Sequence, residues 1–453
     1  DGGILIDSIG NLPVGLVDAG TGAVTLDATG DITAADDNVA DIVGGTISLF
    51  TTTASDTIGT GAAFVEVTAA TAMNADTNDG NIFIESIGNL PVGLIDAGTG
   101  NVTLQSSTTI NDDANDAVND IVANTLELSA ATGIGSANGS LDVNASSLSA
   151  LNATSGAINL ASARSSGDYA VLNLTTKDAG AITFSQTGTS VVTFTTVSSD
   201  GGLITLNAAD GLTINGPVSS IDTAAGSVDG TISGDIAINA DTNTDGTGTF
   251  TLLAISGSIK SNDLLGTGTD DGDLSLIADA FVFPPIPDVD IGDGNFSFAF
   301  STGNSLCLGD ATICDNSLDN ATIDLFAGFS TGALSLSANT FILAENVFNL
   351  GNLNDLNLTA GSTIDDTANV LPLINTAISL PGTLTLTSGT GGVTGVIGGA
   401  SANGDGFTVD VGSLVVDSSA APGGVNQNVT ITADDGIAPT NLVINAAGIN
   451  AGA

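Results

Sequence analysis

Oxygen-bearing side chains stand at alternate positions in the segment DTNTDG, residues 241–246. Alternate oxygen ligands before a glycine suit a calcium-binding turn, because the glycine permits a sharp bend that brings the ligands together. The twelfth position counted from Asp241 is Leu252 rather than glutamate, so the segment is not an EF-hand. We expect Asp241, Asn243 and Asp245 to bind Ca2+, with an ordinary turn rich in Asp and Asn as the alternative.

Two further segments concentrate carboxylates with almost no basic residue nearby. Such clusters repel internally unless they are solvated or bind cations, so each is a candidate metal site. The alternative is a pair of solvated turns. The carboxylates are Asp270, Asp271 and Asp273 in the first segment and Asp288, Asp290 and Asp293 in the second.

Cys307 and Cys314 are the only cysteines in the sequence. One close pair in a lysine-poor chain is typical of an oxidising, extracellular setting. We therefore expect a disulfide that closes a small loop, with two buried free thiols as the alternative.

Enzymatic activity has little support in the sequence. The chain has no histidine to act as a general base, and neither a nucleophile motif nor a zinc-ligand spacing is present. Three basic residues stand against 50 acidic ones, for a net charge of −47. Phosphate binding needs lysine and arginine, so the composition argues against a nucleic-acid partner.

The elements that must position these residues are indicated by an internal repeat, residues 2–49 and 80–128. The first copy begins GGILIDSIGNLPVGLVDAGTG and the second GNIFIESIGNLPVGLIDAGTG. Within each copy, short apolar runs alternate with Thr, Ser or Asn and are separated by turn residues. Alternation with a period of two indicates strands that bury one face. We expect an all-β protein, an elongated parallel β-solenoid (β-helix), with tandem β-sandwich domains as the alternative.

Several phrases carry a resemblance to a known group: AVTLDATGDIT, LITLNAADGLTI, LNLTAGSTIDD and LTLTSGTGGVTG. They resemble the right-handed parallel β-helix of filamentous-haemagglutinin-like secreted proteins, over most of the chain except residues 281–348. That resemblance implies an exported bacterial surface fibre or adhesin. The N-terminal secretion domain of that family has no counterpart in the sequence, so no secretion route is implied.

Residues 281–348 differ from the remainder by holding nine of the 16 phenylalanines. They form either a widened coil filled with phenylalanine, beside a disulfide-tied loop, or an excursion whose aromatic side chains contact a neighbouring subunit. We therefore expect a repeat-bearing solenoid over residues 1–280, this aromatic and proline-rich segment, and further solenoid over residues 349–453.

The leading functional hypothesis is a structural, extracellular or cell-surface protein. The chain repeats, opens within a repeat as a piece of a longer precursor would, and is apolar for an acidic chain, so we expect self-association into a cation-stabilised filament, sheath or coat. No stretch is long and apolar enough for a membrane span. An adhesin that binds carbohydrate or a cell surface through loops near residues 281–320 is the alternative. Ice binding, from Thr-x-Thr at residues 51–53 and 385–387, is a minor one.

Overall fold

The structure is a computed structural model, and the part of the chain that it describes is given by the following residue ranges. It describes residues 2–35, 37–135, 139–221, 233–261, 271–302, 305–308, 314–329, 332–343, 347–349, 355–365, 376–388, 392–394, 396–397, 407–418, 430–431 and 441–446.

The described chain is nearly all β-structure, and its named strands pair in parallel, as a β-solenoid requires and a β-sandwich does not. The fold class expected from the sequence is therefore confirmed. The strands up to residue 290 are β1 (Ile4–Ser8), β2 (Leu12–Pro13), β3 (Val17–Asp18), β4 (Val24–Ala28), β5 (Ile32–Thr33), β6 (Ile42–Thr51), β7 (Val65–Thr77), β8 (Ile82–Ser86), β9 (Leu90–Asp96), β10 (Val102–Ser106), β11 (Thr109–Asp112), β12 (Ile121–Ala130), β13 (Gly133–Ile134), β14 (Leu141–Asn152), β15 (Ile158–Ser162), β16 (Tyr169–Thr175), β17 (Ile182–Gln186), β18 (Val192–Phe194), β19 (Val197–Ser199), β20 (Ile204–Ala208), β21 (Gly211–Ile214), β22 (Pro217–Ser220), β23 (Ile236–Asn239), β24 (Thr249–Leu252), β25 (Ser258–Lys260), β26 (Leu274–Ala278), β27 (Ala280–Val282) and β28 (Asp288–Asp290).

One helix interrupts the strands of the remaining chain. The elements are β29 (Phe296–Phe300), β30 (Ser305–Leu308), β31 (Asn316–Leu318), α1 (Asn320–Ala327), β32 (Ala333–Leu343), β33 (Val347–Asn349), β34 (Asp355–Asp365), β35 (Thr376–Ser388), β36 (Gly392–Thr394), β37 (Val396–Ile397), β38 (Phe407–Ser418), β39 (Thr430–Ile431) and β40 (Asn441–Ala446).

Residue contacts divide the chain into two units. Unit 1 comprises residues 1–243, 248–260 and 281–288, and unit 2 comprises residues 244–247, 261–280 and 289–453. The sequence-based domain boundaries stay a prediction.

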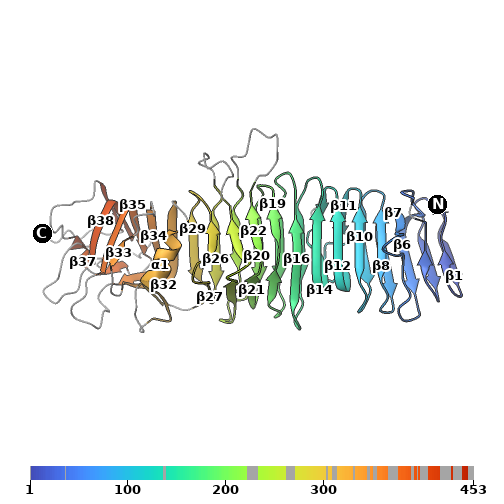
Figure 1. Ribbon diagram of the computed structural model, residues 1–453, viewed down its shortest axis with the longest axis horizontal. Helices are drawn as coiled ribbons and strands as arrows, with labels where there is room; N and C mark the ends of the chain where they lie inside the picture. Colours follow the sequence, from blue (N-terminus) through green and yellow to red (C-terminus); the bar gives the residue numbers. More distant parts are fainter. Residues whose placement is uncertain are drawn as a thin grey trace. The chain divides into compact units, whose positions relative to one another are not determined.

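In unit 1, each coil places its strands directly on those of the coil before it. Ile4 of β1 aligns with Val24 of β4, and Ile82 of β8 aligns with Val102 of β10, 20 residues later in each case. Figure 1 shows β8, β10, β12 and β14 side by side as successive rungs. The coil length thus follows from the spacing of the apolar runs.

The interior of unit 1 is a set of stacked apolar side chains. Ile158, Ile182, Ile204 and Ile236 align on four consecutive coils, and all four are fully buried. The residue after each of them points outward and is small or polar, because successive side chains of a strand face opposite sides. Burying one isoleucine contributes about 1.5–3 kcal/mol, so repetition of this pattern supplies the stability.

The turns between strands bring coils into close backbone contact. A side chain at Gly80 would collide with the carbonyl group of Asp56 on the preceding coil. Glycine is therefore required here by the approach of two backbones.

Unit 2 repeats the parallel ladder with a more aromatic interior. Phe296 and Phe298 of β29 are 0% and 2% exposed and pack against Phe326 of α1, with ring centroids 5.1 and 4.8 Å away. The helix begins after Asp319, whose side chain accepts a hydrogen bond from Thr322 N (2.8 Å). In β29 these two phenylalanines therefore fill the interior of a coil.

Candidate metal centre

The predicted calcium loop, residues 241–246, is divided between the two units. Asp241 and Asn243 belong to unit 1, whereas Asp245 belongs to unit 2. Asp241 is fully buried, Asn243 Nδ2 donates to Asp210 Oδ1 (2.8 Å), and Asp245 Oδ1 accepts from Thr247 N (3.1 Å). Asn243 and Asp245 thus bond to different residues, Asp210 and Thr247, and Asp241 is buried. Calcium binding by the three together stays a prediction.

The two acidic clusters meet where a carboxylate of the first accepts a hydrogen bond from the backbone of the second. Asp271 Oδ2 accepts a hydrogen bond from Asp293 N (2.9 Å), within unit 2. Burial raises the pKa of Asp293, and the charge on Asp271 raises it further. Asp273 Oδ1 accepts from Asn295 N (2.7 Å), and Asp290 Oδ1 accepts from Gly292 N (3.3 Å).

The other two residues of these clusters are separated from this contact. Asp288 belongs to unit 1, where its Oδ1 lies 3.2 Å from Lys260 Nζ. Asp270 lies outside the described residues. Metal binding by the two clusters predicted from the sequence therefore stays a prediction.

The structure joins Cys307 of β30 to Cys314 by a disulfide, with the Cα atoms 5.6 Å apart. Cys307 is fully buried. The bond closes a short loop, in the part of the chain that also holds the buried phenylalanines.

Three other carboxylates converge in unit 1, and the sequence did not single them out as a group. Asp112 ends β11, Asp120 directly precedes β12, and Asp142 lies in β14. One carboxylate oxygen from each lies within 4.8 Å of the others, and no other such trio of acidic, histidine or cysteine side chains occurs among the described residues. Oxygen atoms at this separation can bind one hard divalent cation together.

Backbone hydrogen bonds fix two of the three carboxylates. Asp120 N donates to Asp142 O (2.8 Å), and Asp142 N donates to Asp120 Oδ2 (2.7 Å). Asp112 Oδ1 accepts from Ala114 N (2.8 Å). Asp112 and Asp120 are 1% and 6% exposed, so their charges are removed from bulk water. We call these three residues the Asp120 cluster.

The electrostatics of the Asp120 cluster disfavour three negative charges. Burial raises the pKa of Asp120 to about 8; the Asp142 N–H opposes this rise, and the charges on Asp112, Asp142 and Asp116 add to it. Burial also raises the pKa of Asp142, again assisted by Asp112 and Asp116. A bound cation would offset this repulsion without requiring a proton.

The Asp120 cluster could not be read from local spacing, because coil stacking brings its members together. One signal was present: Asp41 and Asp120 occupy the same position of the repeat, before Ile-Val. Both copies therefore carry an aspartate at the same place, and the second copy also has the nearby pair Asp112-Asp113. This repetition indicates a turn that is acidic in each copy.

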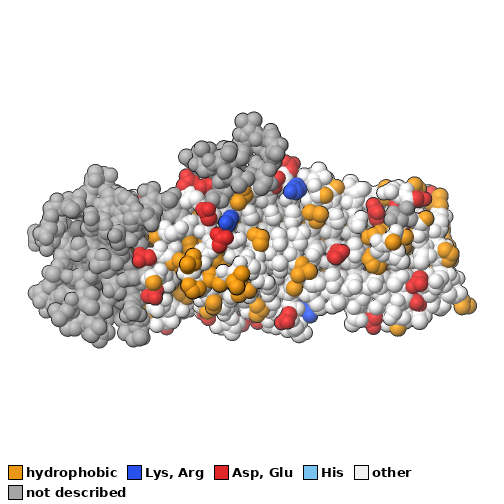
Figure 2. Space-filling model, in the orientation of Figure 1, with side chains coloured by type: hydrophobic (Ala, Val, Ile, Leu, Met, Phe, Trp, Pro, Cys, Tyr) orange, Lys and Arg blue, Asp and Glu red, His pale blue; other side chains and the backbone are white. Residues whose placement is uncertain are grey.

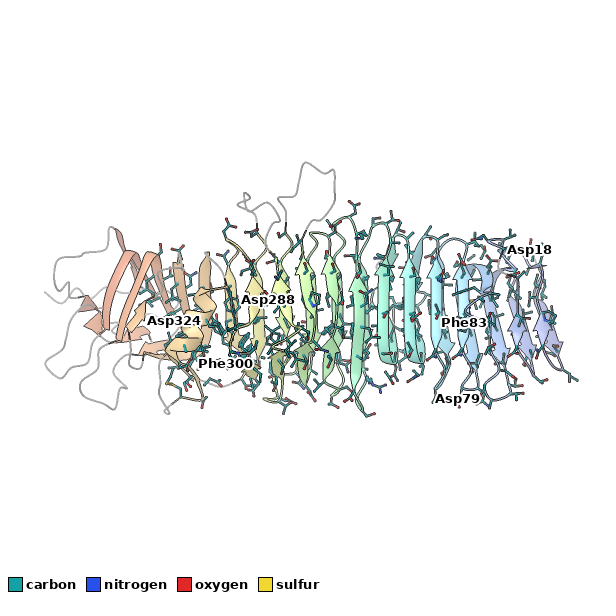
Figure 3. The ribbon with its side chains drawn as sticks, in the orientation of Figure 1. Asp18, Asp79, Phe83, Asp288, Phe300 and Asp324 are labelled. Carbon is teal, nitrogen blue, oxygen red and sulfur yellow. A yellow bond between two sulfur atoms is a disulfide. The ribbon has the colours of Figure 1, made fainter. Side chains whose placement is uncertain are left out.

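A second concentration of acid lines a hollow of about 590 Å3 in unit 1. Burial, and the charge on Asp96, raise the pKa of Asp76. Hydrogen bonds from the backbone and hydroxyl of Thr99 lower the pKa of Asp79, which lies at the lower edge of the view in Figure 3. The residues that line the hollow include no lysine or arginine, so it suits cations rather than anions.

The chain matches no protein-family model, no curated protein and no solved structure. The likeness to filamentous-haemagglutinin-like proteins thus rests on residue pattern alone. Among the described helical residues, no segment is long and apolar enough to cross a bilayer.

Proposed function

We propose that the chain is an extracellular structural protein whose copies associate into a surface filament, sheath or coat. The observation that carries this proposal is an exposed apolar surface on the side of the unit 1 solenoid, which we call the Ile286 patch. A regular stack of coils supplies a rigid shaft, and an apolar area on its side supplies a place for a second copy.

The Ile286 patch is built by residues in and after two paired strands, β24 and β27. Ile255 is 100% exposed, Ile286 86% and Val282 50%. On either side of Val282 in the sequence, Phe281 and Phe283 stack in parallel with centroids 6.2 Å apart, and the Phe283 ring centroid lies 5.8 Å from that of Phe250 in β24. Exposed aliphatic side chains on an aromatic base are typical of the buried centre of an interface.

Charge explains why a second copy fits this patch. The chain carries a net charge of −47, so two copies repel over most of their surfaces. At the patch, Lys260 Nζ lies 3.2 Å from Asp288 Oδ1, so the negative charge of Asp288 is balanced by a positive one. Figure 2 shows apolar side chains gathered near the place where Figure 3 labels Asp288.

We place the proposed calcium ion in the Asp120 cluster. Its three carboxylates come from β11, from the residue before β12 and from β14, so a shared cation would tie neighbouring coils together. The expected consequence is a solenoid that melts at higher temperature with calcium than with excess chelator.

The test is sedimentation velocity and electron microscopy of three proteins: the wild type, Ile286→Asp, and Leu16→Asp. Both substitutions add one negative charge at a strongly exposed aliphatic side chain, and Leu16 (73% exposed) lies outside the patch. We expect the wild type and Leu16→Asp to assemble with rising concentration, and Ile286→Asp to remain monomeric.

Wild type that stays monomeric at every concentration, or Ile286→Asp that assembles like the wild type, contradicts self-association through this patch. Saturable glycan binding by the monomer would then favour the adhesin alternative. For ice binding, a uniform threonine ladder is needed, and Thr385 aligns with Asn357 on the neighbouring strand, so that ladder is mixed.

A further inference from the structure

Asp41, directly before β6, bonds to two strands of neighbouring coils, β3 and β7, at one corner of the first repeat copy. Its carbonyl oxygen accepts a hydrogen bond from Val17 N of β3 (2.8 Å). Its N–H donates to Glu66 O of β7 (2.8 Å), and its Oδ2 accepts from Glu66 N (3.0 Å). Asp41 is 7% exposed, so its carboxylate bridges coils away from bulk water.

The partner residue brings a second buried carboxylate to this corner. Glu66 is fully buried, and its Oε2 accepts a hydrogen bond from Asp37 N (3.2 Å). No hydrogen bond from the described residues reaches Glu66 Oε1, which is also buried. A buried carboxylate oxygen without a donor is costly, so this atom is a place for a hydrogen-bond donor or a positive charge.

The groups that face Asp41 among the described residues are all acidic. Glu66 comes from β7 and Asp37 from the loop before Asp41. Asp18 of β3 aligns with Val43 instead. Asp18, labelled in Figure 3, is exposed, and its Oδ1 accepts from Gly20 N (2.8 Å). Burial raises the pKa of Asp41 to about 6; the Glu66 N–H opposes this, and the charges on Glu66 and Asp37 add to it.

A proton fits this corner better than a metal ion does. Asp37, Asp41 and Glu66 do not bring three carboxylate oxygens within 4.8 Å of one another, as the Asp120 cluster does. A divalent cation would therefore find too few ligands among the described residues, whereas a proton needs one carboxylate to bind it.

We propose that Asp41 and Glu66 form a proton-sensitive clasp between neighbouring coils. In mildly acidic solution Asp41 takes one proton from solvent, which forms an O–H bond on its carboxylate and removes its repulsion with Glu66. Near neutral pH that proton is lost, two like charges remain buried, and the loop of residues 37–41 loosens from β7. The solenoid is thereby tighter in acid than at neutral pH.

The first test is hydrogen-ion titration of the folded protein in excess chelator. It compares the wild type, Asp41→Asn, and the control Asp18→Asn, which removes an exposed carboxylate from the same repeat copy. The wild type should release one more proton than Asp41→Asn in a step centred near pH 6. Asp18→Asn should keep that step.

Hydrogen exchange of wild-type protein provides a second readout that needs no variant. After correction for intrinsic exchange, protection of the Asp37, Asp41 and Glu66 amides should fall several-fold between about pH 5 and pH 7. Identical titration of the wild type and Asp41→Asn across this range overturns the proposal. Protection that does not change with pH overturns it equally, even where Asp41→Asn fails to fold.

Discussion

The two copies of the internal repeat build the same corner on the same backbone but fill it with different numbers of carboxylates. In the first copy, Asp41 Oδ2 accepts from Glu66 N; in the second, Asp120 Oδ2 accepts from Asp142 N. Both aspartates also donate their own N–H to that partner's carbonyl group, at 2.8 Å. Backbone geometry therefore does not distinguish the corners.

Besides the partner residue, Glu66 or Asp142, the corners differ at one position near the end of the preceding strand. Ile32 pairs with Leu12 in the first copy as Ile110 pairs with Leu90 in the second, so Ala34 stands where Asp112 stands. Two acids can be neutralised by one proton, whereas three converging acids suit a divalent cation. The same scaffold thus supports two different responses, and side-chain count decides between them.

The largest expected effect comes from Asp112→Ala, which leaves the second corner with two converging carboxylates, Asp120 and Asp142. With calcium at 100 times its dissociation constant, binding stabilises the wild type by about 2.7 kcal/mol, and the variant should lose that gain. Denaturant titrations with calcium and with chelator measure it, and terbium luminescence reports binding directly. Equal calcium stabilisation of both proteins would remove the distinction between the corners.

Next comes Glu66→Gln, which removes one charge from the first corner. The raised pKa of Asp41 gives the wild type a stability contribution that is full below about pH 4 and is lost as pH rises through about 6. The full loss amounts to about 3 kcal/mol, and the variant should show a smaller one because Asp41 then faces a neutral partner. Unfolding midpoints in chelator from pH 4 to 8 test this. A variant with the wild-type slope would show that Glu66 does not act on Asp41.

A smaller effect is expected from Ala34→Asp, which gives the first corner a third carboxylate. In chelator the added charge should destabilise the protein by about 1 kcal/mol, and calcium should reverse this loss. Terbium luminescence is measured in an Asp112→Ala background, so that the second corner does not contribute. A new signal would show that the added carboxylate lets the first corner bind a cation. Its absence would mean that carboxylate number alone is insufficient.

The smallest effect concerns a feature that the corners share. Asn38 and Asn115 both have positive φ, 59° and 52°, and both are exposed. Replacing either with glycine preserves the left-handed turn, so each variant should lose less than about 0.5 kcal/mol, measured by thermal unfolding. Unequal losses would show that the two loops are not equivalent.

The sequence predicted the solenoid because its signals are local and repeated. Alternation in residues 82–86 and 102–106 marks inward side chains, and Ile82, Ile84, Val102 and Leu104 are all fully buried. The helix α1 was not predicted, since its eight residues are too few for a clear helical period. The Asp120 cluster was missed because its members meet through coil register, which sequence spacing does not specify.

The parallel ladder of unit 1 has a mechanical consequence. Its backbone hydrogen bonds run from coil to coil, along the stacking direction, so tension applied in that direction pulls on the contacts between coils. Such a ladder is expected to break one coil at a time, because the hydrogen bonds of each coil break before those of the next are loaded. Each released coil of 20 residues can extend to about 70 Å, which lets the shaft absorb a sudden pull in successive steps.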